Sequence, residues 1–466
     1  MMTAKRSNTI CAIATPPGSG AIAVIRVSGD DSVKVAKRIF FPRKKGKKQV
    51  PGSVIYGEIR DGKKVIDDVL FTLFAAPHSY TGEDGFEISC HGSAYIQKEI
   101  LQLLLHCGVR MAEPGEFTQR AFLNGKMDLT QAEAVADIIA ADSEASHRIA
   151  MQQMRGGVSN ELSELRERLM NMAAMVELEL DFSEEDVEFA NRSELQNLLN
   201  EIETRLKMLV ESFERGNAMK SGFLVVIAGP VNSGKSTLLN ALLNEERAIV
   251  SHIPGTTRDV VEDSMMIQGV KIRFADTAGI RKTINVIENL GIDRTYQQAG
   301  KASLILFLST PDEKPIQIRA SLGRLLKHSK NDIPVLHLIN KSENLDKKEI
   351  SGLQKELAVV KSDRRLFISA KYRQGIEDVT RSINEMLQLG KLNSGDVTIS
   401  NIRHLDALKQ ALNACRRTRK AFASNLTTDL IAQEIRQINY HLGTITGQIS
   451  DREVLGRIFE RFCVGK

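Results

Sequence analysis

The stretch Gly229-Pro230-Val231-Asn232-Ser233-Gly234-Lys235-Ser236 fits the pattern G-x-x-x-x-G-K-[ST]. It follows the apolar run Phe223 to Ala228 and precedes the helical run Thr237 to Asn244, which is the context in which this pattern binds phosphates. The glycines let backbone N–H groups close around phosphate oxygens, and the helix N-terminus adds positive potential. We expect Lys235 to reach the β- and γ-phosphates and Ser236 to bind Mg²⁺.

Four further segments follow in the order expected of a GTP-binding domain. Gly255-Thr256-Thr257-Arg258-Asp259 supplies a threonine, Thr257, for Mg²⁺ and the γ-phosphate. Asp276-Thr277-Ala278-Gly279 ends a strand. It supplies the Asp276 carboxylate behind the Mg²⁺ ligands and the backbone N–H of Gly279 for the γ-phosphate. Asn340-Lys341-Ser342-Glu343 resembles N-K-x-D, which reads guanine, and Ser369-Ala370-Lys371 matches the last loop around the base. The four pieces together predict GTP rather than ATP.

Two positions depart from the usual pattern. The guanine reader ends in Glu343 rather than Asp, which keeps the carboxylate for the guanine N1 and 2-amino protons on a stem one methylene longer. Ile280 stands where Ras-like proteins place a Gln that orients water, so catalysis must come from another group. The candidates nearby are Arg258, Arg281 and Glu288.

A monovalent cation is a further candidate for the catalytic charge. Asn232 adds an oxygen ligand in the phosphate loop, and the carbonyls of Ser251 to Thr256 could add more, so that a cation would replace an arginine finger. The expected ligands of this cation, K⁺, are Asn232, Ser251, Ile253 and Thr256. The expected GTP-binding residues are Asn232, Ser233, Gly234, Lys235, Ser236, Thr237, Ser251, His252, Ile253, Pro254, Gly255, Thr256, Thr257, Asp276, Thr277, Ala278, Gly279, Asn340, Lys341, Ser342, Glu343, Ser369, Ala370 and Lys371. Lys235 and Glu288 are the expected catalytic residues.

The nucleotide site lies in a region, residues 222–388, where strands and helices alternate, and this alternation predicts a doubly wound, mostly parallel sheet. The expected strands are Phe223 to Ala228, Val270 to Ala275, Ser303 to Leu308, Val335 to Ile339 and Arg365 to Ile368.

Both flanks of this region read as helix. Residues 127–221 carry apolar side chains at helical spacing, with long helices expected over Leu129 to Arg155, Ser159 to Leu180 and Ser193 to Arg215. Residues 389–466 return to helix, so the simplest architecture is one helical domain with the α/β domain inserted into it. The acidic cluster between Asp181 and Glu188 favours a solvated loop over a metal site.

Residues 1–126 form a third region, which reads as mixed α/β. Ala21 to Val27, Val65 to Phe74 and Gly85 to Cys90 are strand candidates, and Ala94 to His106 has helical spacing. His91 and Cys90 invite interpretation as a nucleophilic pair, but adjacent strand residues point to opposite faces, which argues against it.

Composition sets broad limits. The formal charge is +5, from 63 Lys+Arg and 58 Asp+Glu, which permits nucleic-acid binding without requiring it. The basic run Arg43 to Lys48 fits either a phosphate-contacting patch or a solvated loop between two strands. The five cysteines are odd in number and widely spread, which disfavours a disulfide framework or zinc site and favours the cytoplasm. We expect no signal peptide and, without a run of ~18 apolar residues, no membrane span.

Motifs along the whole chain resemble the MnmE (TrmE) family of tRNA wobble-uridine modification GTPases. Within the nucleotide-binding region they are the phosphate loop with its Asn, G-T-T-R-D, D-T-A-G-[IL]-R, and Glu288 in Glu288 to Ile292. Outside it they are Ala14 to Gly18, Ile25 to Gly29, Tyr80 to Asp84, Glu87 to Gly92, Pro114 to Phe117, Arg120 to Lys126, Gly456 to Phe459 and Phe462 to Lys466.

The resemblance implies an N-terminal α+β domain that binds folate and dimerises, a helical domain, and an inserted, potassium-dependent Ras-like P-loop GTPase domain. It implies a homodimer that works with an FAD-dependent MnmG-type partner on C5 of the wobble uridine of certain tRNAs. The carbon of the aminomethyl or carboxymethylaminomethyl group would come from 5-formyl- or 5,10-methylene-tetrahydrofolate. By motif position, Arg26, Glu87, Lys126 and Lys466 would contact folate, and Cys463 in the tail is a candidate for chemistry.

An alternative of a different class is a GTP-switched assembly factor that binds ribosomal RNA without modifying it. Its nucleotide-binding domain could look the same. The N-terminal domain and the tail Phe462 to Lys466, which such a factor does not need, argue for modification. A folate-binding scaffold that has lost GTP turnover is disfavoured by Lys235, Ser236, Thr257, Asp276 and Glu288.

Overall fold

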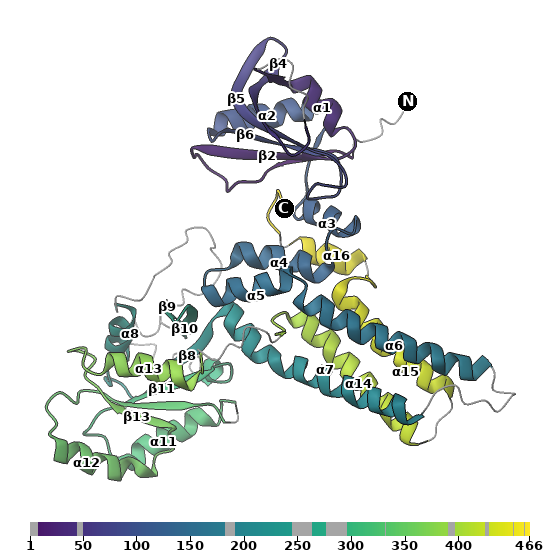
Figure 1. Cartoon of the computed structure of the whole chain (residues 1–466). Coiled ribbons are helices and arrows are strands. Elements are labelled where there is room, and N and C mark those ends of the chain that lie inside the picture. The colour runs from purple at the N-terminus through teal and green to yellow at the C-terminus, as the bar shows by residue number, and fades with distance from the viewer. Residues whose placement is uncertain are drawn as a thin grey trace. The chain divides into compact units, whose positions relative to one another are not determined.

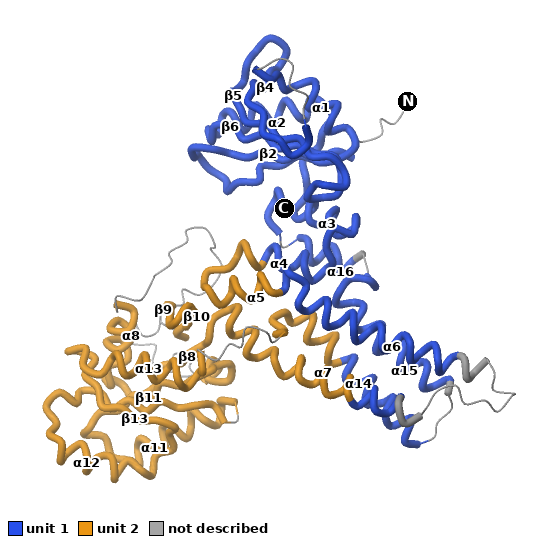
Figure 2. Tube along the Cα trace, in the orientation of Figure 1, with its two compact units in different colours: residues 1–136, 153–200, 410–466 blue, residues 137–152, 201–409 orange. Residues whose placement is uncertain are grey.

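The structure is a computed structural model that describes residues 8–43, 50–181, 192–244, 263–275, 296–330, 332–389, 397–424, 428–450, 452–460 and 462–466. Its residues form two compact units (Figure 2). One unit comprises residues 1–136, 153–200 and 410–466, and the other comprises residues 137–152 and 201–409. The domain ranges 1–126, 127–221, 222–388 and 389–466 remain predictions from the sequence.

The first unit contains a seven-stranded sheet (Figure 1). Its strands are β1 (Ile10–Ile13), β2 (Ile22–Ser28), β3 (Phe40–Pro42), β4 (Val54–Asp61), β5 (Lys64–Phe74), β6 (Gly85–His91) and β7 (Arg110–Met111). They lie in the order β3-β4-β5-β6-β2-β1-β7, antiparallel except for the β1–β7 pair. The expected strands and helix of this region are confirmed, with the helix at Ala94–His106.

Two helices, α1 (Ser32–Ile39) and α2 (Ala94–His106), bury apolar side chains with this sheet. Ile39 of α1 and Leu104 of α2 join Phe71, Phe86 and Ile88 in one buried cluster. Burial of this kind contributes about 25 cal/mol for each Å² of apolar surface removed from water. Strands β2 and β6 therefore belong to a sheet that α1 and α2 cover.

The second unit contains a six-stranded sheet. Its strands are β8 (Phe223–Ala228), β9 (Asp263–Ile267), β10 (Val270–Phe274), β11 (Leu304–Ser309), β12 (Val335–Ile339) and β13 (Arg364–Phe367). The order is β13-β12-β11-β8-β10-β9, parallel except for β9. Strands β8, β11 and β12 are buried along their whole length, as parallel strands covered on both faces require. The predicted doubly wound sheet is confirmed.

Helices cover both faces of this sheet. The helices are α8 (Lys235–Leu243), α11 (Pro315–Leu326), α12 (Lys347–Glu356), the short 3₁₀ helix η1 (Leu357–Val359) and α13 (Ile376–Met386). Side chains of α8 and α13 belong to one buried cluster, and those of α11 belong to another. Because β8, β11 and β12 are parallel, their carboxyl ends meet at one edge, where ligands of such folds bind.

The remaining helices are α3 (Glu116–Leu123), α4 (Leu129–Ala140), α5 (Glu144–Met154), α6 (Gly157–Asp181), α7 (Arg192–Ser221), α14 (Ile402–Ala423), α15 (Thr428–Thr446) and α16 (Arg452–Phe459). Helices α6 and α15 lie side by side, with Arg436 paired to Glu177 at 2.6 Å. Cys415 of α14 donates to the carbonyl of Leu199 on α7. Among the helices of the described residues, none has the length and apolarity to cross a membrane.

The single helix expected over Leu129 to Arg155 is wrong, because the structure divides it into α4 and α5. Ser143 causes the break. The backbone N–H of Ser146 donates to the Ser143 hydroxyl at 3.1 Å, and the backbone N–H of Ser143 donates to the Ser146 hydroxyl at the same distance. Reciprocal caps of this kind start a new helix. The other two long helices are confirmed within α6 and α7.

Helix α5 packs on the hairpin formed by β9 and β10. Ala145 and Ile149 of α5 join the buried cluster of the six-stranded sheet, and the backbone N–H of Ala145 donates to the carbonyl of Gly269 at 3.0 Å. Lys271 of β10 pairs with Asp142 at 2.6 Å. The hairpin is therefore held by a helix that precedes it by more than one hundred residues in the sequence.

Candidate nucleotide site and N-terminal pocket

The phosphate loop joins the end of β8 to the start of α8, as predicted. Its backbone adopts positive φ at Gly229 (148°), Asn232 (63°) and Gly234 (96°). A Cβ at Gly234 would lie 2.1 Å from Nδ2 of Asn340, and one at Gly229 would lie 2.3 Å from the carbonyl oxygen of Leu308. Both positions therefore require glycine, for conformation and for space.

Lys235 folds back over this loop. Its Nζ donates to the carbonyl oxygens of Gly229 at 2.9 Å and Pro230 at 2.6 Å. Burial lowers the pKa of Lys235, while the nearby Glu313 carboxylate opposes that change. Its contacts in the loop are neutral carbonyls, so the ammonium charge is available to phosphate oxygens placed there.

Asn340 connects the three described segments of the predicted GTP site. It follows β12 and is 3% exposed. Its Nδ2 donates to the carbonyl of Ser233 at 2.8 Å, and its Oδ1 accepts the backbone N–H of Ala370 at 2.9 Å. One amide therefore ties the phosphate loop, at Ser233, to the Ser369–Lys371 loop.

Glu343 presents a carboxylate at this junction. Its pKa is lowered by its own backbone N–H, then by the Ser369 hydroxyl and the ammonium groups of Lys371 and Lys341. Its Oε2 is buried with no hydrogen-bond partner among the described residues. An ionised carboxylate with a free acceptor suits the N1 and 2-amino donors of guanine.

Several predicted residues lie outside the described part of the chain. They are Ser251, His252, Ile253, Pro254, Gly255, Thr256, Thr257, Arg258, Asp276, Thr277, Ala278, Gly279, Ile280, Arg281 and Glu288, together with Lys44 to Lys48 of the basic run. Arg43, which is described, follows β3 directly and pairs with Asp68 at 2.9 Å.

A second group of predicted residues meets in the seven-stranded sheet. Arg26 on β2 lies opposite Glu87 on β6, and the Arg26 Nε pairs with the Glu87 carboxylate at 2.8 Å. Both line a cavity of about 70 Å³ together with Ser28, Tyr80 and Thr81. The Nη1 of Arg26 is buried without a hydrogen-bond partner among the described residues, so one donor remains for a ligand.

The C-terminal tail reaches the same pair. Burial lowers the pKa of Lys466, the Arg26 charge lowers it further, and the Glu87 charge opposes both. Gly465 has a φ of +99°, and a Cβ there would lie 2.4 Å from the carbonyl oxygen of Ile13. The tail is therefore packed on β1. Its thiol, Cys463, is exposed.

Lys126 lies beside this group rather than in it. Its Nζ donates to the carbonyl of Pro77 at 2.9 Å, and its stem lies next to Gly82. It thus touches the loop that supplies Tyr80 and Thr81 to the cavity, while Arg26 and Glu87 line the cavity itself. Of the four expected folate contacts, the structure brings Arg26, Glu87 and Lys466 close together.

Cys90 and His91 do not form a nucleophilic pair. Burial raises the pKa of the Cys90 thiol to about 11, with a further contribution from the Asp67 charge. His91 is exposed, and its Nδ1 lies 2.7 Å from Asp67. The opposite-face argument from the sequence is confirmed.

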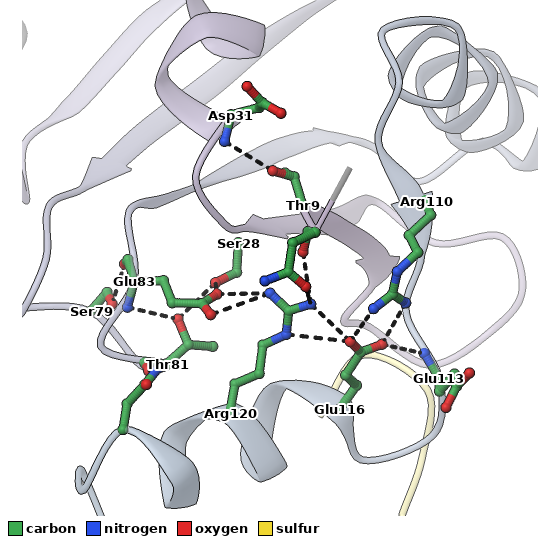
Figure 3. Close-up of polar contacts among 12 residues, drawn as sticks. Thr9, Ser28, Asp31, Ser79, Thr81, Glu83, Arg110, Glu113, Glu116 and Arg120 are labelled. Carbon is green, nitrogen blue, oxygen red and sulfur yellow. Dashed lines mark hydrogen bonds and ion pairs between the residues drawn. The ribbon is translucent and has the colours of Figure 1, made fainter. Parts of the chain in front are cut away.

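An ion-pair network around Arg120 and Glu116 on α3 was not predicted from the sequence (Figure 3). A signal was present, because Glu116 and Arg120 stand four residues apart on one face of a helix. Their other partners are remote in sequence. Arg120 reaches Glu83 and Asn8, which are 37 and 112 residues away.

Family models match most of the chain. The MnmE helical domain matches residues 129–463, and the N-terminus of GTP-binding protein TrmE matches residues 9–126. The tRNA modification GTPase MnmE of Flavobacterium psychrophilum is 49% identical over 464 residues, which is 98% of this chain and 99% of that protein. The protein of the same name from Bacteroides thetaiotaomicron is 48% identical, with the same coverage.

The chain belongs to the MnmE family. It is accordingly a GTP hydrolase that acts in tRNA modification. The MnmE assignment agrees with the geometry described above, since the phosphate loop, the Asn340 segment and the Ser369 segment meet as a guanine-nucleotide site requires. It also confirms the layout of a TrmE-type N-terminal domain, a helical domain and a P-loop domain.

Proposed function

We propose that this chain uses GTP hydrolysis to drive modification at C5 of the wobble uridine of certain tRNAs. The product is an aminomethyl or carboxymethylaminomethyl group, made together with an FAD-dependent MnmG-type partner. The proposal rests chiefly on Asn340, which joins the phosphate loop to the base-contacting loop in a chain whose family modifies tRNA. The protein acts as a homodimer in the cytoplasm.

In the proposed hydrolysis step, Lys235 stabilises charge on the β- and γ-phosphates, and Ser236 and Thr257 would hold Mg²⁺. The phosphate loop suits this role, because its glycine backbone leaves N–H groups for anionic oxygens. Glu288 orients the attacking water through a second water. Asn232, Ser251, Ile253 and Thr256 would hold K⁺, which would supply the catalytic charge.

The K⁺ proposal has a direct test. Replacing K⁺ by Na⁺ at equal ionic strength slows GTP hydrolysis, and Asn232→Ala removes the difference. The effect is measurable, because the arginine finger that K⁺ replaces contributes ~10³ to 10⁵ in rate where it exists. Equal rates in the two salts would show that the catalytic charge comes from a side chain such as Arg258 or Arg281.

We propose that the cavity beside Arg26 and Glu87 binds one edge of a tetrahydrofolate derivative, the 5-formyl or 5,10-methylene form. A carboxylate suits the amide and amine edge of a pterin, and cations suit the glutamate carboxylates of folate. The unpartnered Nη1 of Arg26 and the proximity of Lys466 support this use. Lys126 contributes through the adjacent loop, and Cys463 is the thiol nearest to Lys466 in the tail. When bound, the folate supplies the carbon.

Mass spectrometry of tRNA nucleosides tests the whole proposal. A deletion strain lacks the modified wobble uridine, the wild-type gene restores it, and a gene lacking residues 462–466 does not. The truncated protein keeps its GTP hydrolysis, because the phosphate loop belongs to the other compact unit. Unmodified tRNA in cells with the wild-type gene would favour an RNA assembly factor instead.

A further inference from the structure

Helix α3 carries a buried arginine that reaches the N-terminal pocket through other side chains. The Arg120 side chain is 9% exposed. Its Nη1 donates to Oε2 of Glu83 at 3.0 Å, and its Nη2 donates to Oε1 of Glu116 at 2.9 Å (Figure 3). The same Nη2 donates to the carbonyl of Asn8 at 2.7 Å. One guanidinium therefore joins three segments of the domain.

Glu83 links Arg120 to residues that line the cavity. The Ser28 hydroxyl donates to Oε2 of Glu83 at 2.8 Å and lies 2.7 Å from the Thr81 hydroxyl. The backbone N–H of Glu83 donates to the Thr81 hydroxyl at 3.2 Å. Ser28 and Thr81 both line the cavity next to Arg26 and Glu87. Only Glu83 separates Arg120 from these two wall residues.

The same helix holds another wall residue, Tyr80. The hydroxyls of Tyr80 and Thr118 lie 2.9 Å apart, and Thr118 is on α3. The Arg26 guanidinium lies 5.0 Å from the centroid of the Tyr80 ring, within the range of a cation–π contact. Displacing the Ser79–Asp84 loop would therefore move Thr81 and Tyr80 together.

The two carboxylates of the network differ in how they are neutralised. Glu116 has two cations, since Arg110 Nη1 donates to its Oε2 at 2.8 Å while Arg120 contacts its Oε1. For Glu83, Arg120 is the cation within ion-pair distance among the described residues. Removing one partner of a buried pair leaves an uncompensated charge, which is strongly destabilising. Loss of Arg120 therefore leaves an uncompensated carboxylate at Glu83, in the Ser79–Asp84 loop.

We propose that Arg120 is a positioning residue of the pocket, which fixes the Ser79–Asp84 loop so that its wall meets the pterin edge of a tetrahydrofolate. The inference rests on the proposed folate site. Arg120 acts through Glu83, Ser28 and Thr81 and does not touch the ligand.

Matched variants of the full chain test the proposal. Arg120→Gln removes the cation that pairs with Glu83. Arg110→Gln removes a cation that pairs with Glu116 and leaves the Arg120–Glu83 pair in place. Calorimetry with 5-formyl-tetrahydrofolate should show affinity about 10-fold or more weaker for Arg120→Gln, because a loop with an uncompensated carboxylate spends less time in the conformation that binds the ligand. Arg110→Gln should stay within a few fold of wild type.

A double variant separates positioning from simple loss of structure. In Glu83→Gln/Arg120→Gln, two amides can still hydrogen-bond, and no uncompensated carboxylate remains at the loop. Folate affinity should recover most of the loss, whereas a folding defect from removing Arg120 would persist. A double variant that is as well folded as wild type but binds as weakly as Arg120→Gln would overturn the proposal.

The remaining outcomes are distinct. If wild type does not bind 5-formyl-tetrahydrofolate, the proposed function fails and takes the inference with it. If wild type binds and Arg120→Gln binds equally well, the folate site stands and positioning by Arg120 is refuted. Equal weakening by Arg110→Gln and Arg120→Gln would assign the network to general stability and also refute it.

Discussion

The phosphate loop is shaped by its backbone, whereas the wall of the N-terminal pocket is held by side chains. At Gly229 and Gly234 the conformation itself excludes other residues. At the pocket, ordinary strand and loop backbone is fixed by Arg120, Glu83 and Glu116 through hydrogen bonds and charge. The first kind of site leaves a short, ordered motif in the sequence, and the second leaves scattered polar residues. The two kinds should also fail differently when altered.

The largest expected effect is in the backbone of the phosphate loop. In Gly234→Ala, the new Cβ meets Nδ2 of Asn340 at 2.1 Å in a conformation with φ of +96°. We expect GTP affinity at least about 10²-fold weaker, from ~1–3 kcal/mol of strain and the displaced amide. A fluorescent, non-hydrolysable GTP analogue measures this affinity. Gly323→Ala on α11, with no atom within 4 Å of the new Cβ, is the matched control. Normal binding by Gly234→Ala would contradict a backbone-defined site.

Lys235→Ala tests the side chain that we propose supplies positive charge in the loop. Turnover should fall by about 10² to 10³, the usual cost of removing a positioned donor from developing charge. Single-turnover phosphate release at saturating GTP measures this step, and Lys327→Ala, at the exposed end of α11, should leave it unchanged. Normal turnover in Lys235→Ala would show that the phosphate-loop assignment is wrong.

Glu116→Gln tests the side-chain network through its pH dependence. Burial raises the pKa of Glu116, but hydrogen bonds from Arg110, the Glu113 backbone and Arg120 outweigh burial and lower the pKa to about 2 from 4.5. A carboxyl with a lowered folded-state pKa stabilises the fold above pH 4.5, and this contribution is lost as the pH falls toward 2. The shift corresponds to about 3 kcal/mol.

The wild-type N-terminal region should therefore lose stability between pH 4.5 and 2. Glu116→Gln should lose less in that window and be weaker at neutral pH. Hydrogen exchange of the amides in residues 113–121, corrected for the intrinsic effect of pH, measures the change. Glu113→Gln, with an exposed side chain, is the control. An unchanged acid transition in Glu116→Gln would mean that the network contributes little to the domain.

The smallest effect is expected where side-chain charges lie near the surface of the nucleotide-binding unit. Lys271→Ala breaks the pair with Asp142, whose side chains are 26% and 29% exposed. Partly exposed pairs contribute about 0–1 kcal/mol, and the difference should shrink in 1 M salt, where the Debye length is about 3 Å. Urea unfolding measures it, with Lys220→Ala at the similar Asp137 pair for comparison. A loss of several kcal/mol in the free energy of unfolding would mean that side-chain charges stabilise the nucleotide-binding unit as strongly as the N-terminal pocket.

The same contrast explains what the sequence could predict. The phosphate loop, Asn340 and Ser369–Lys371 were predictable because each is a short motif whose backbone or amide geometry serves one purpose. The strands β8 and β12 were predictable from their apolar runs, which are unbroken in β8 and interrupted only by His337 in β12. The break at Ser143 was not found, because a two-serine cap is weak beside the helical periodicity on either side.

Apart from the Glu116–Arg120 pair on one helix, the Arg120 network could not be predicted, because its parts come from separate segments of the sequence. Glu83 and Asn8 are far from Arg120 in the sequence, and only folding of the sheet brings them within hydrogen-bond distance of it. The proximity of Lys466 to Arg26 likewise depends on the packing of Gly465 against Ile13. Without the resemblance to a family, nothing in the tail itself indicates that it ends beside β2.

The distribution of the five thiols has a consequence for labelling chemistry. Burial raises the pKa of Cys11 to about 12 and that of Cys90 to about 11, burial also raises the pKa of Cys107, and Cys415 has no exposed surface. Maleimides react with thiolates that solvent can reach. Cys463 is the exposed thiol, so the unaltered chain should take up one fluorophore, in the tail beside Lys466. Its emission would then report on ligands that enter the neighbouring pocket.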